Sequence, residues 1–195
     1  MKQFYKNISE LLTEVWWGVL KFASEELRKE RSKLLTAVKQ DYWALKYASE
    51  ELQADRKVVL EAVRHNGYAL DYASQELQND REVVMVAVKH FGWALNFASQ
   101  ELRKDRGVVL EAVWQYGLAL YYTSQELQND REVVMLAVMQ DGLALQFASE
   151  ELRADREVVM VAVKQNGEAL RYASEELQVE LAINNQPTHK PYKPF

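Results

Sequence analysis

The sequence predicts an all-α fold, an α-solenoid built from two-helix repeats of 25 residues. The first observation is a recurrence in strict register: serine and glutamate return at this period together with an arginine, at Arg31, Arg56, Arg81, Arg106, Arg131 and Arg156. The second is the helical period of the apolar residues inside each unit. The third is that all three prolines lie beyond residue 186, which leaves the repeated body free of helix breakers.

The domain organisation follows from the repeat. Residues 23–178 are predicted to form six tandem repeats. Residues 1–22 are predicted to form an N-terminal capping helix, with Trp16 and Trp17 covering the first exposed core. Residues 179–195 are predicted to hold the remnant of a C-terminal cap, where the D-R-x-V-V pattern is lost, and an extended proline-rich tail, QPTHKPYKPF.

The first element of each unit is predicted to be a helix. Its valine-rich run, Val83–Val88 in one unit, would also suit the strand of a leucine-rich-repeat horseshoe. At about 100° per residue, however, the positions that stay apolar fall in one arc of about 200°. Glutamate replaces Val86 at Glu61 and Glu111, which a strand buried on both faces would not accept. Asp80 is placed to cap the start of this helix, and Gly92 to close its end in a left-handed conformation.

A second short helix, of about ten residues, is predicted after the glycine, from Trp93 to Leu102 in the same unit. Ala94, Leu95 and Ala98 line its inner face, and Ser99 at the border is expected to bond the carbonyl four residues back. Helices this short are unstable alone, so stacking of neighbouring units has to supply the stability.

The unit Asp155–Leu177, DREVVMVAVKQNGEALRYASEEL, resembles a family of tandem helical repeats classed as a domain of unknown function, family 4116. The resemblance covers about residues 23–178, and six units match the motif in register. It implies a helical repeat architecture and no activity.

Composition narrows the function classes. The formal charge of −5 disfavours nonspecific binding to nucleic acids or to anionic membranes, which need a positive surface. The lack of cysteine excludes disulfides, thiolate catalysis and cysteine-ligated metals, and it suits a reducing compartment. No apolar run approaches the roughly 18 residues of a membrane span. A soluble, cytoplasmic protein without a cofactor is therefore expected.

Two sets of ionisable residues are candidates for chemistry. The first recurs in nearly every unit as Glu76, Asp80 and Arg81, and a carboxylate beside a cation could serve acid–base catalysis. A structural role is favoured, in which the aspartate caps a helix and the arginine bridges to the glutamate that closes the preceding helix. The second set is His65 and His90, at equivalent positions, but later units carry glutamine there, so no metal site is expected. No enzyme activity is predicted.

Variation between units points to a binding surface. Around the third turn of the solenoid, large apolar residues gather at positions that the fold does not need. These are Phe91, Trp93, Trp114, Tyr116, Leu118, Tyr121, Leu136, Met139 and Leu143. Exposed aromatic patches are typical of protein interfaces, so a partner protein is predicted to bind here, through all of these residues except Leu136. Trp93 and Trp114 are expected to be removable together without loss of stability.

Two other functions stay open. The chain could instead be an assembly subunit that self-associates through an open solenoid end or through the C-terminal tail. It could also read single-stranded RNA, one base per helical unit, through the variable residues of the second helix. The acidic balance and the lack of a basic stripe disfavour this second alternative.

Overall fold

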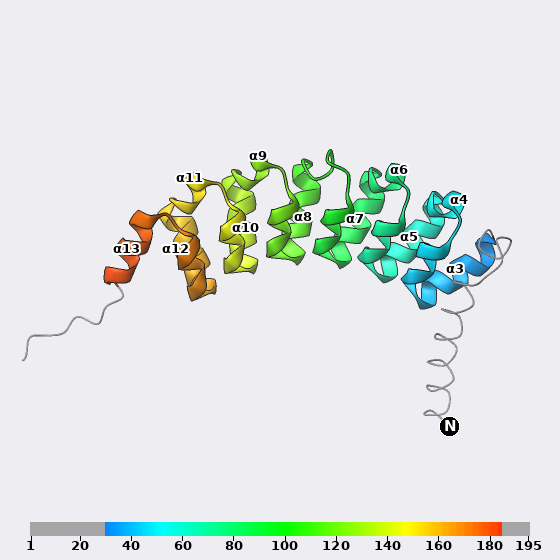
Figure 1. The fold of residues 1–195 in the computed structure, drawn as a ribbon, viewed down its shortest axis with the longest axis horizontal. Coiled ribbons are helices and arrows are strands. Elements are labelled where there is room, and N and C mark those ends of the chain that lie inside the picture. Colours follow the sequence, from blue (N-terminus) through cyan, green and yellow to red (C-terminus); the bar gives the residue numbers. More distant parts are fainter. Residues whose placement is uncertain (1–29, 185–195) are drawn as a thin grey trace, which may run out of the picture.

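A computed structural model describes residues 30–184 as a single row of stacked helical repeats (Figure 1). The described residues form helices and turns without a strand, which confirms the predicted all-α solenoid. The row bends into an arch from α3 (Arg31–Gln40) at one end to α13 (Glu175–Asn184) at the other (Figure 1). The predicted capping helix, residues 1–22, and the proline-rich tail lie outside the described residues.

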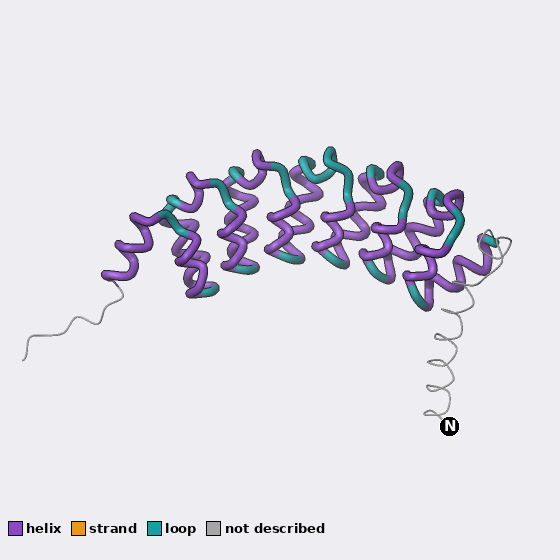
Figure 2. The backbone as a smooth tube through the Cα atoms, in the orientation of Figure 1, coloured by secondary structure: helices purple, strands orange, loops and turns teal. Residues whose placement is uncertain are grey.

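Each repeat begins with a ten-residue α-helix, followed by a six-residue 3-10 helix and a short α-helical turn. The long helices are α3, α5 (Arg56–His65), α7 (Arg81–His90), α8 (Arg106–Gln115), α10 (Arg131–Gln140) and α12 (Arg156–Gln165). The 3-10 helices are η1 (Tyr42–Tyr47), η2 (Gly67–Tyr72), η3 (Gly92–Phe97), η4 (Gly117–Tyr122), η5 (Gly142–Phe147) and η6 (Gly167–Tyr172). The short α-helices are α4 (Glu50–Gln53), α6 (Gln75–Gln78), α9 (Gln125–Gln128) and α11 (Glu150–Arg153). Loops lie along both long edges of the row (Figure 2).

The long helices after α3 begin where the sequence predicts, directly after an aspartate. The carboxylate of Asp80 accepts hydrogen bonds from the backbone N–H groups of Glu82 and Val83, at 2.9 and 3.1 Å. The aspartates before α5, α8, α10 and α12 cap their helices likewise, whereas Glu30 before α3 makes no side-chain cap. These caps satisfy N–H groups that the first helical turn leaves unpaired.

The prediction of one continuous second helix, from Trp93 to Leu102, is wrong, because the segment is divided at Ala98. Gly92–Phe97 form the 3-10 helix η3, Ala98 is extended at ψ 154°, and residues 100–103 make only a turn. The break has its cause in the neighbouring repeat, since the N–H of Ser99 donates to the carbonyl of Gln78 at 3.0 Å. A continuous helix would use that N–H internally. The extended residue therefore ties each repeat to the one before it.

The repeated serine also acts across the boundary between repeats. The hydroxyl of Ser99 donates to Oδ1 of Asn79 at 2.5 Å and accepts the N–H of Leu102 at 3.3 Å. The predicted bond to the carbonyl four residues back is therefore wrong. Ser99 begins a helical turn instead of lying inside a helix, so its hydroxyl faces the N–H groups of that turn.

The repeated glycine has a different role from the predicted one. No glycine among residues 30–184 has a positive φ, so the left-handed helix ending assigned to Gly92 is wrong. Gly92 is instead the buried first residue of η3. A Cβ atom there would overlap the carbonyl oxygen of Ala112 and lie 2.9 Å from Cβ of Tyr116, both in the next repeat. Glycine is needed because the two backbones approach so closely.

The core lies between two layers, the long α-helices and the 3-10 helices. Each central long helix packs against the long helices on either side and against the 3-10 helices of its own and the preceding repeat. The buried side chains of one repeat are Val83, Val84, Ala87 and Val88 of α7 with Ala94 and Leu95 of η3. The same positions are buried in the other central repeats, so apolar burial runs through the stack without a break. The opposite side of each long helix is an outer face.

The repeat pattern ends in α13, which is longer than the other helices in its position. Leu177 and Leu181 of α13 are buried, and Glu180 accepts a hydrogen bond from Nε of Arg156 at 3.1 Å. This glutamate stands where the earlier repeats carry their capping aspartate. Within the part of the chain that the structure describes, no helix is long and apolar enough to cross a membrane.

Candidate interaction surfaces

An ion-pair ladder runs along the solenoid at the starts of the long helices. The Nε of Arg81 donates to Oδ2 of Asp105 at 2.8 Å, and Arg106 donates to Asp130 at the same distance. The equivalent pairs are Arg31 with Asp55, Arg56 with Asp80, and Arg131 with Asp155. The sequence predicted that each arginine pairs with the glutamate that closes the preceding short helix, and this prediction is wrong. Each arginine pairs instead with the aspartate that caps the next long helix.

The ladder determines how the capping aspartates ionise. The hydrogen bond from Arg81 lowers the pKa of Asp105, and the one from Arg106 lowers the pKa of Asp130. Each carboxylate is thus held in its charged form while it caps a helix and joins two repeats. Because the same arrangement recurs from repeat to repeat, these residues have a structural role in the stack.

The two repeated histidines do not share a site. Nε2 of His65 lies 3.6 Å from Oε1 of Glu61 on the same helix, whereas His90 lines a recess between α7 and α8. Among residues 30–184, His, Asp and Glu side chains form no group of three or more that could hold a metal ion.

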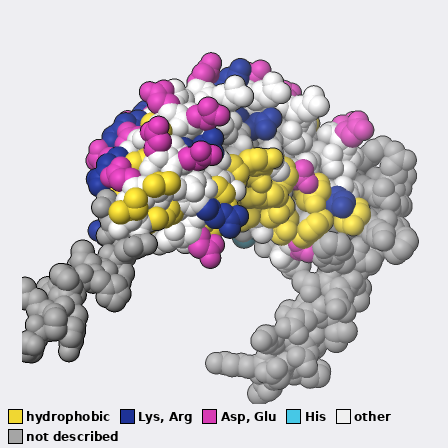
Figure 3. Space-filling model, turned by 60° about the vertical axis from the view of Figure 1, so that its left-hand side comes forward, with side chains coloured by type: hydrophobic (Ala, Val, Ile, Leu, Met, Phe, Trp, Pro, Cys, Tyr) yellow, Lys and Arg dark blue, Asp and Glu magenta, His cyan; other side chains and the backbone are white. Residues whose placement is uncertain are grey.

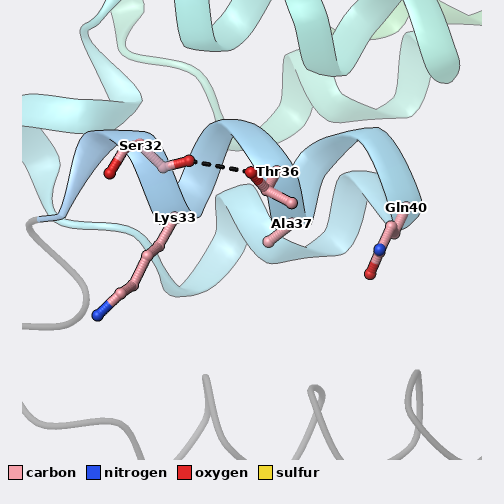
Figure 4. Close-up of a pocket in the computed structure, with 5 residues that line it drawn as sticks. All are labelled: Ser32, Lys33, Thr36, Ala37 and Gln40. Atoms are coloured by element: carbon pink, nitrogen blue, oxygen red, sulfur yellow. Dashed lines mark hydrogen bonds between the residues drawn. The ribbon is translucent and has the colours of Figure 1, made fainter.

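A shallow pocket lies along α3, at the first described helix of the stack (Figure 4). Its lining comes from this one helix and consists of Ser32, Lys33, Thr36, Ala37 and Gln40. The hydroxyl of Thr36 donates to the carbonyl of Ser32 at 3.2 Å, and Lys33 pairs with Glu30 at 2.7 Å. The lining brings no acid, base or nucleophile from a second element, so we assign no chemistry to this pocket.

The eight residues predicted to bind a partner lie in three places. Trp114 and Met139 are on the outer faces of α8 and α10. Four others belong to the 3-10 layer, across the core: Trp93, Leu118, Tyr121 and Leu143. Phe91 and Tyr116 lie at the turns between the layers. The most exposed of the eight are Met139 and Tyr121, each 59% exposed, followed by Trp114 at 56% and Tyr116 at 38%. The structure therefore divides the predicted cluster between several surfaces.

The outer face of the long helices carries the first of these surfaces. Trp114 and Met139 occupy the same position in consecutive repeats, on helices that pack side by side. A groove of about 520 Å³ runs beside them, lined by Leu110, Arg131, Glu132, Met135, Leu136 and Met139. Met160 of α12 extends the exposed apolar surface and is 41% exposed. Leu110, Met135 and Met160 were missed because their position is apolar in every unit and was assigned to the core.

The aromatic residues of the 3-10 layer are largely engaged with one another. The ring centroid of Trp93 lies 4.8 Å from that of Tyr68, 5.2 Å from that of Phe97 and 5.9 Å from that of Tyr122. Such ring pairs stabilise the packing of one repeat on the next. Trp93 therefore belongs to the packing of the stack. Trp114, by contrast, is 56% exposed and takes part in no such ring pair within the described residues.

An aromatic recess of about 450 Å³ opens between α7 and α8. It is lined by Tyr68, His90, Phe91, Gly92, Trp93, Gln115 and Tyr116. Three successive repeats contribute rings, and the centroids of Tyr68 and Phe91 are 5.1 Å apart. Sequence reasoning placed Phe91, Trp93 and Tyr116 together but did not join them with Tyr68. That neighbour is recognised only once the repeats are stacked at the spacing of packed helices.

Apolar side chains gather in patches on the surface. The face shown in Figure 3 has a large hydrophobic area near its centre and a smaller separate one beside it, with charged side chains between them and a mixture of acidic and basic side chains above. The mixture of signs agrees with ion pairs between neighbouring repeats, such as Arg56 with Glu82. An exposed apolar area of this kind offers surface for a binding partner to bury.

Comparison with protein families identifies the repeat. A family model described as a domain of unknown function (DUF4116) matches five stretches of the chain, residues 15–53, 55–103, 80–128, 105–153 and 130–178. The last four start at successive steps of 25 residues, so each covers two neighbouring repeats. No curated protein and no solved structure matches the chain.

Proposed function

The chain belongs to the family described as a domain of unknown function (DUF4116), and we propose from its own surface that it is a non-catalytic scaffold that binds a partner protein. The binding surface is the outer face of the central long helices, around Trp114 and Met139. The lack of cysteine suits a role in the reducing cytoplasm.

The main support is that the fold does not require apolar residues at these two positions. The equivalent positions of the other repeats hold cations, Lys39, Arg64, Lys89 and Lys164. The helices α5 and α7, which carry Arg64 and Lys89, have the same ten-residue length as α8 and α10 and bury residues at the same four core positions. Large apolar side chains at Trp114 and Met139 are therefore explained by binding better than by folding.

The groove beside Met139 has the chemistry of an adaptable binding surface. Met135 and Met139 supply flexible, polarisable side chains, and Leu110 and Leu136 supply apolar surface next to them. Methionine-lined surfaces accommodate apolar side chains of a partner by changing rotamer. A bulky apolar residue of the partner is the expected occupant of this groove.

The charges around the apolar centre favour a particular kind of partner. Lys89 on α7 and Lys164 on α12 stand on either side of Trp114 and Met139 in the same row, and neither forms an ion pair with a described residue. Arg131 and Glu132 line the groove itself, and each is already engaged in an ion pair with a neighbouring repeat. A segment with apolar anchors in its middle and acidic residues towards its ends complements this row.

The non-catalytic part of the proposal is supported by the repetition itself. The ionisable residues that recur, such as Arg81 and Asp105, are engaged in the same cap and ion pair from repeat to repeat. Catalysis depends on groups placed in one specific constellation, which a ladder of identical contacts does not provide.

The test replaces both anchors by the residue that the fold accepts at their position. Trp114→Lys with Met139→Lys is expected to weaken binding at least about thirtyfold, because buried anchor residues dominate interface energies. Partners captured from native extract by the wild-type chain are identified by mass spectrometry, and the Kd of the isolated partner is then measured by calorimetry. Arg64→Ala, at the same position on α5 and two repeats away from Trp114, is the matched control. If the double variant binds the partner as tightly as the wild type, the surface around Trp114 and Met139 is not the binding surface.

A further inference from the structure

We infer that the aromatic recess between α7 and α8 binds the proline-spaced segment 186–195 of a second copy of this chain, so that copies join head to tail. The recess lies apart from the outer-face groove. The inference therefore stands independently of the proposed partner surface.

The recess has the chemistry that proline-rich segments bind. Its apolar wall is made of aromatic rings, with centroids 4.8 Å apart for Tyr68 and Trp93 and 5.9 Å apart for Phe91 and Trp93. Tyr116 also lines the recess and is 38% exposed. His90 and Gln115 line the same recess and supply hydrogen-bonding groups beside the rings. Grooves that bind polyproline II segments combine flat aromatic faces with a few polar groups in this manner.

The segment 186–195, QPTHKPYKPF, has the complementary pattern. Pro191 and Pro194 are three residues apart, and a polyproline II helix has about three residues per turn, so both rings lie on one side of it. Lys190 and Lys193 share a second side, from which an ammonium group can lie over an aromatic ring. The carbonyl groups of such a helix are not used internally and are available to side-chain donors.

The distance along the stack points to a second copy as the source of the segment. Pro191 lies seven residues beyond Asn184, the end of α13, which an extended polyproline II chain covers in about 22 Å. Between α13 and α8 stand α12 and α10 (Figure 1), so three helix spacings of about 8–10 Å, or about 24–30 Å, separate them. Pro191 therefore falls short of the recess of its own chain, and only the residues after it can approach that recess. Pro191 and Pro194 cannot both bind there within one chain.

Binding between copies is of the head-to-tail type, because the recess and the segment are different surfaces of one chain. Each added copy presents a new recess and a new segment, so assembly grows with concentration unless a ring closes. Two variants separate the surfaces in full-length protein. Pro191→Ala with Pro194→Ala changes the segment, and Tyr116→Asn changes the recess.

Tyr116→Asn is a variant that the fold accepts. Asn66 and Asn166 occupy the same position in other repeats, and their side chains accept the backbone N–H of Tyr68 and of Glu168, at 2.9 and 3.0 Å. An asparagine at residue 116 can therefore cap η4 while it removes one aromatic wall of the recess. We expect at least about tenfold weaker self-association.

Sedimentation velocity over a range of concentrations tests the inference. Wild-type mass is expected to rise with concentration and to fall back when synthetic peptide 186–195 is added in excess, whereas each variant stays largely monomeric. An equimolar mixture of the two variants is expected to form a dimer and nothing larger, because only one working recess and one working segment remain.

Three results would overturn the inference. One is a wild-type chain that stays monomeric at the highest concentration, including the case in which the added peptide binds to it. Another is assembly of the proline variant as strong as that of the wild type. The third is a mixture of variants that fails to dimerise although the wild type assembles. None of these results depends on the lysine substitutions at Trp114 and Met139, so the two proposals can fail separately.

Discussion

Arg81 and Asp105 are 24 residues apart in the chain, yet Nε of Arg81 donates to Oδ2 of Asp105 at 2.8 Å. The other oxygen of the same carboxylate accepts the N–H of Val108 at 3.0 Å. One side chain therefore caps α8 and also joins α8 to the start of α7. This double use links the stability of a helix to the stacking of two repeats.

Substitutions of Asp105 should separate these two roles. Asp105→Ala removes the cap and the ion pair, and we expect a loss of about 1–2 kcal/mol in the free energy of unfolding. Asp105→Asn keeps a capping oxygen and loses the charge, so its loss should be clearly smaller. Urea unfolding followed by circular dichroism measures both. Equal losses for the two variants would show that capping is not the main contribution.

The ladder also makes stability depend on pH. Hydrogen bonds from arginine lower the pKa of Asp55, Asp105 and Asp130. At Asp80 and Asp155 burial raises the pKa, and hydrogen bonds from arginine and from the backbone outweigh it. A carboxyl group with a lowered pKa stabilises the folded chain above its unfolded value, about 4, and this contribution is lost as the pH falls through the folded pKa.

We therefore expect the urea midpoint to change little between about pH 7 and pH 5 and to fall steeply below about pH 4. The measurement is a series of urea titrations at stepped pH. Asp105→Asn, which removes one titrating group, should show a shallower fall. A variant profile parallel to that of the wild type would mean that Asp105 does not contribute to the acid transition.

The parts of the fold that depend on local sequence were predictable. The period of 25 residues is visible as a recurrence of residues in the sequence. The long helices and their aspartate caps depend on contacts within a few residues of one another. The break at Ala98 was not, because it depends on a hydrogen bond from Ser99 to Gln78 in the preceding repeat. The role of Gly92 likewise depends on the carbonyl of Ala112, twenty residues later. Both errors arise where one repeat meets the next.

The candidate surfaces were also predictable only in part. The exposure of Trp114 and Met139 could be inferred, since Lys89 occupies the same position one repeat earlier and a charged residue there must face solvent. The contacts of Trp93 with Tyr68 and Tyr122 could not, because they depend on the distance between stacked 3-10 helices. A position that varies between repeats is one where the fold accepts several residue types. Only the structure shows whether an aromatic ring at such a position is exposed or stacked against its neighbours.

Two glycines at equivalent positions give a matched test of close packing between repeats. Gly92→Ala places a methyl group against the carbonyl of Ala112, so we expect a loss of about 1–3 kcal/mol from overpacking. Gly167 starts the last 3-10 helix, and a Cβ atom there has no neighbour within 4 Å. Gly167→Ala should be neutral or slightly stabilising. Thermal and urea unfolding of the two variants check this, and a similar loss in both would point to backbone conformation as the cause.

Substitution of Trp93 should destabilise the fold, whereas substitution of Trp114 should not. Trp93 lies within ring-contact distance of Tyr68, Phe97 and Tyr122, so Trp93→Ala is expected to cost about 3 kcal/mol. Leucine occupies the same position in the next repeat, as Leu118. Trp93→Leu should therefore lower the free energy of unfolding by less than Trp93→Ala, because a large apolar side chain remains.

Trp114 is 56% exposed on the outer face of α8, and Trp114→Lys should change the free energy of unfolding by no more than about 0.5 kcal/mol. Urea unfolding gives both energies, and near-ultraviolet circular dichroism reports on the packed rings. We expect that spectrum to lose intensity in Trp93→Ala and to change little in Trp114→Lys. Comparable destabilisation by the two substitutions would place Trp114 in the packing of the stack, and its apolar side chain would then need no binding partner to explain it.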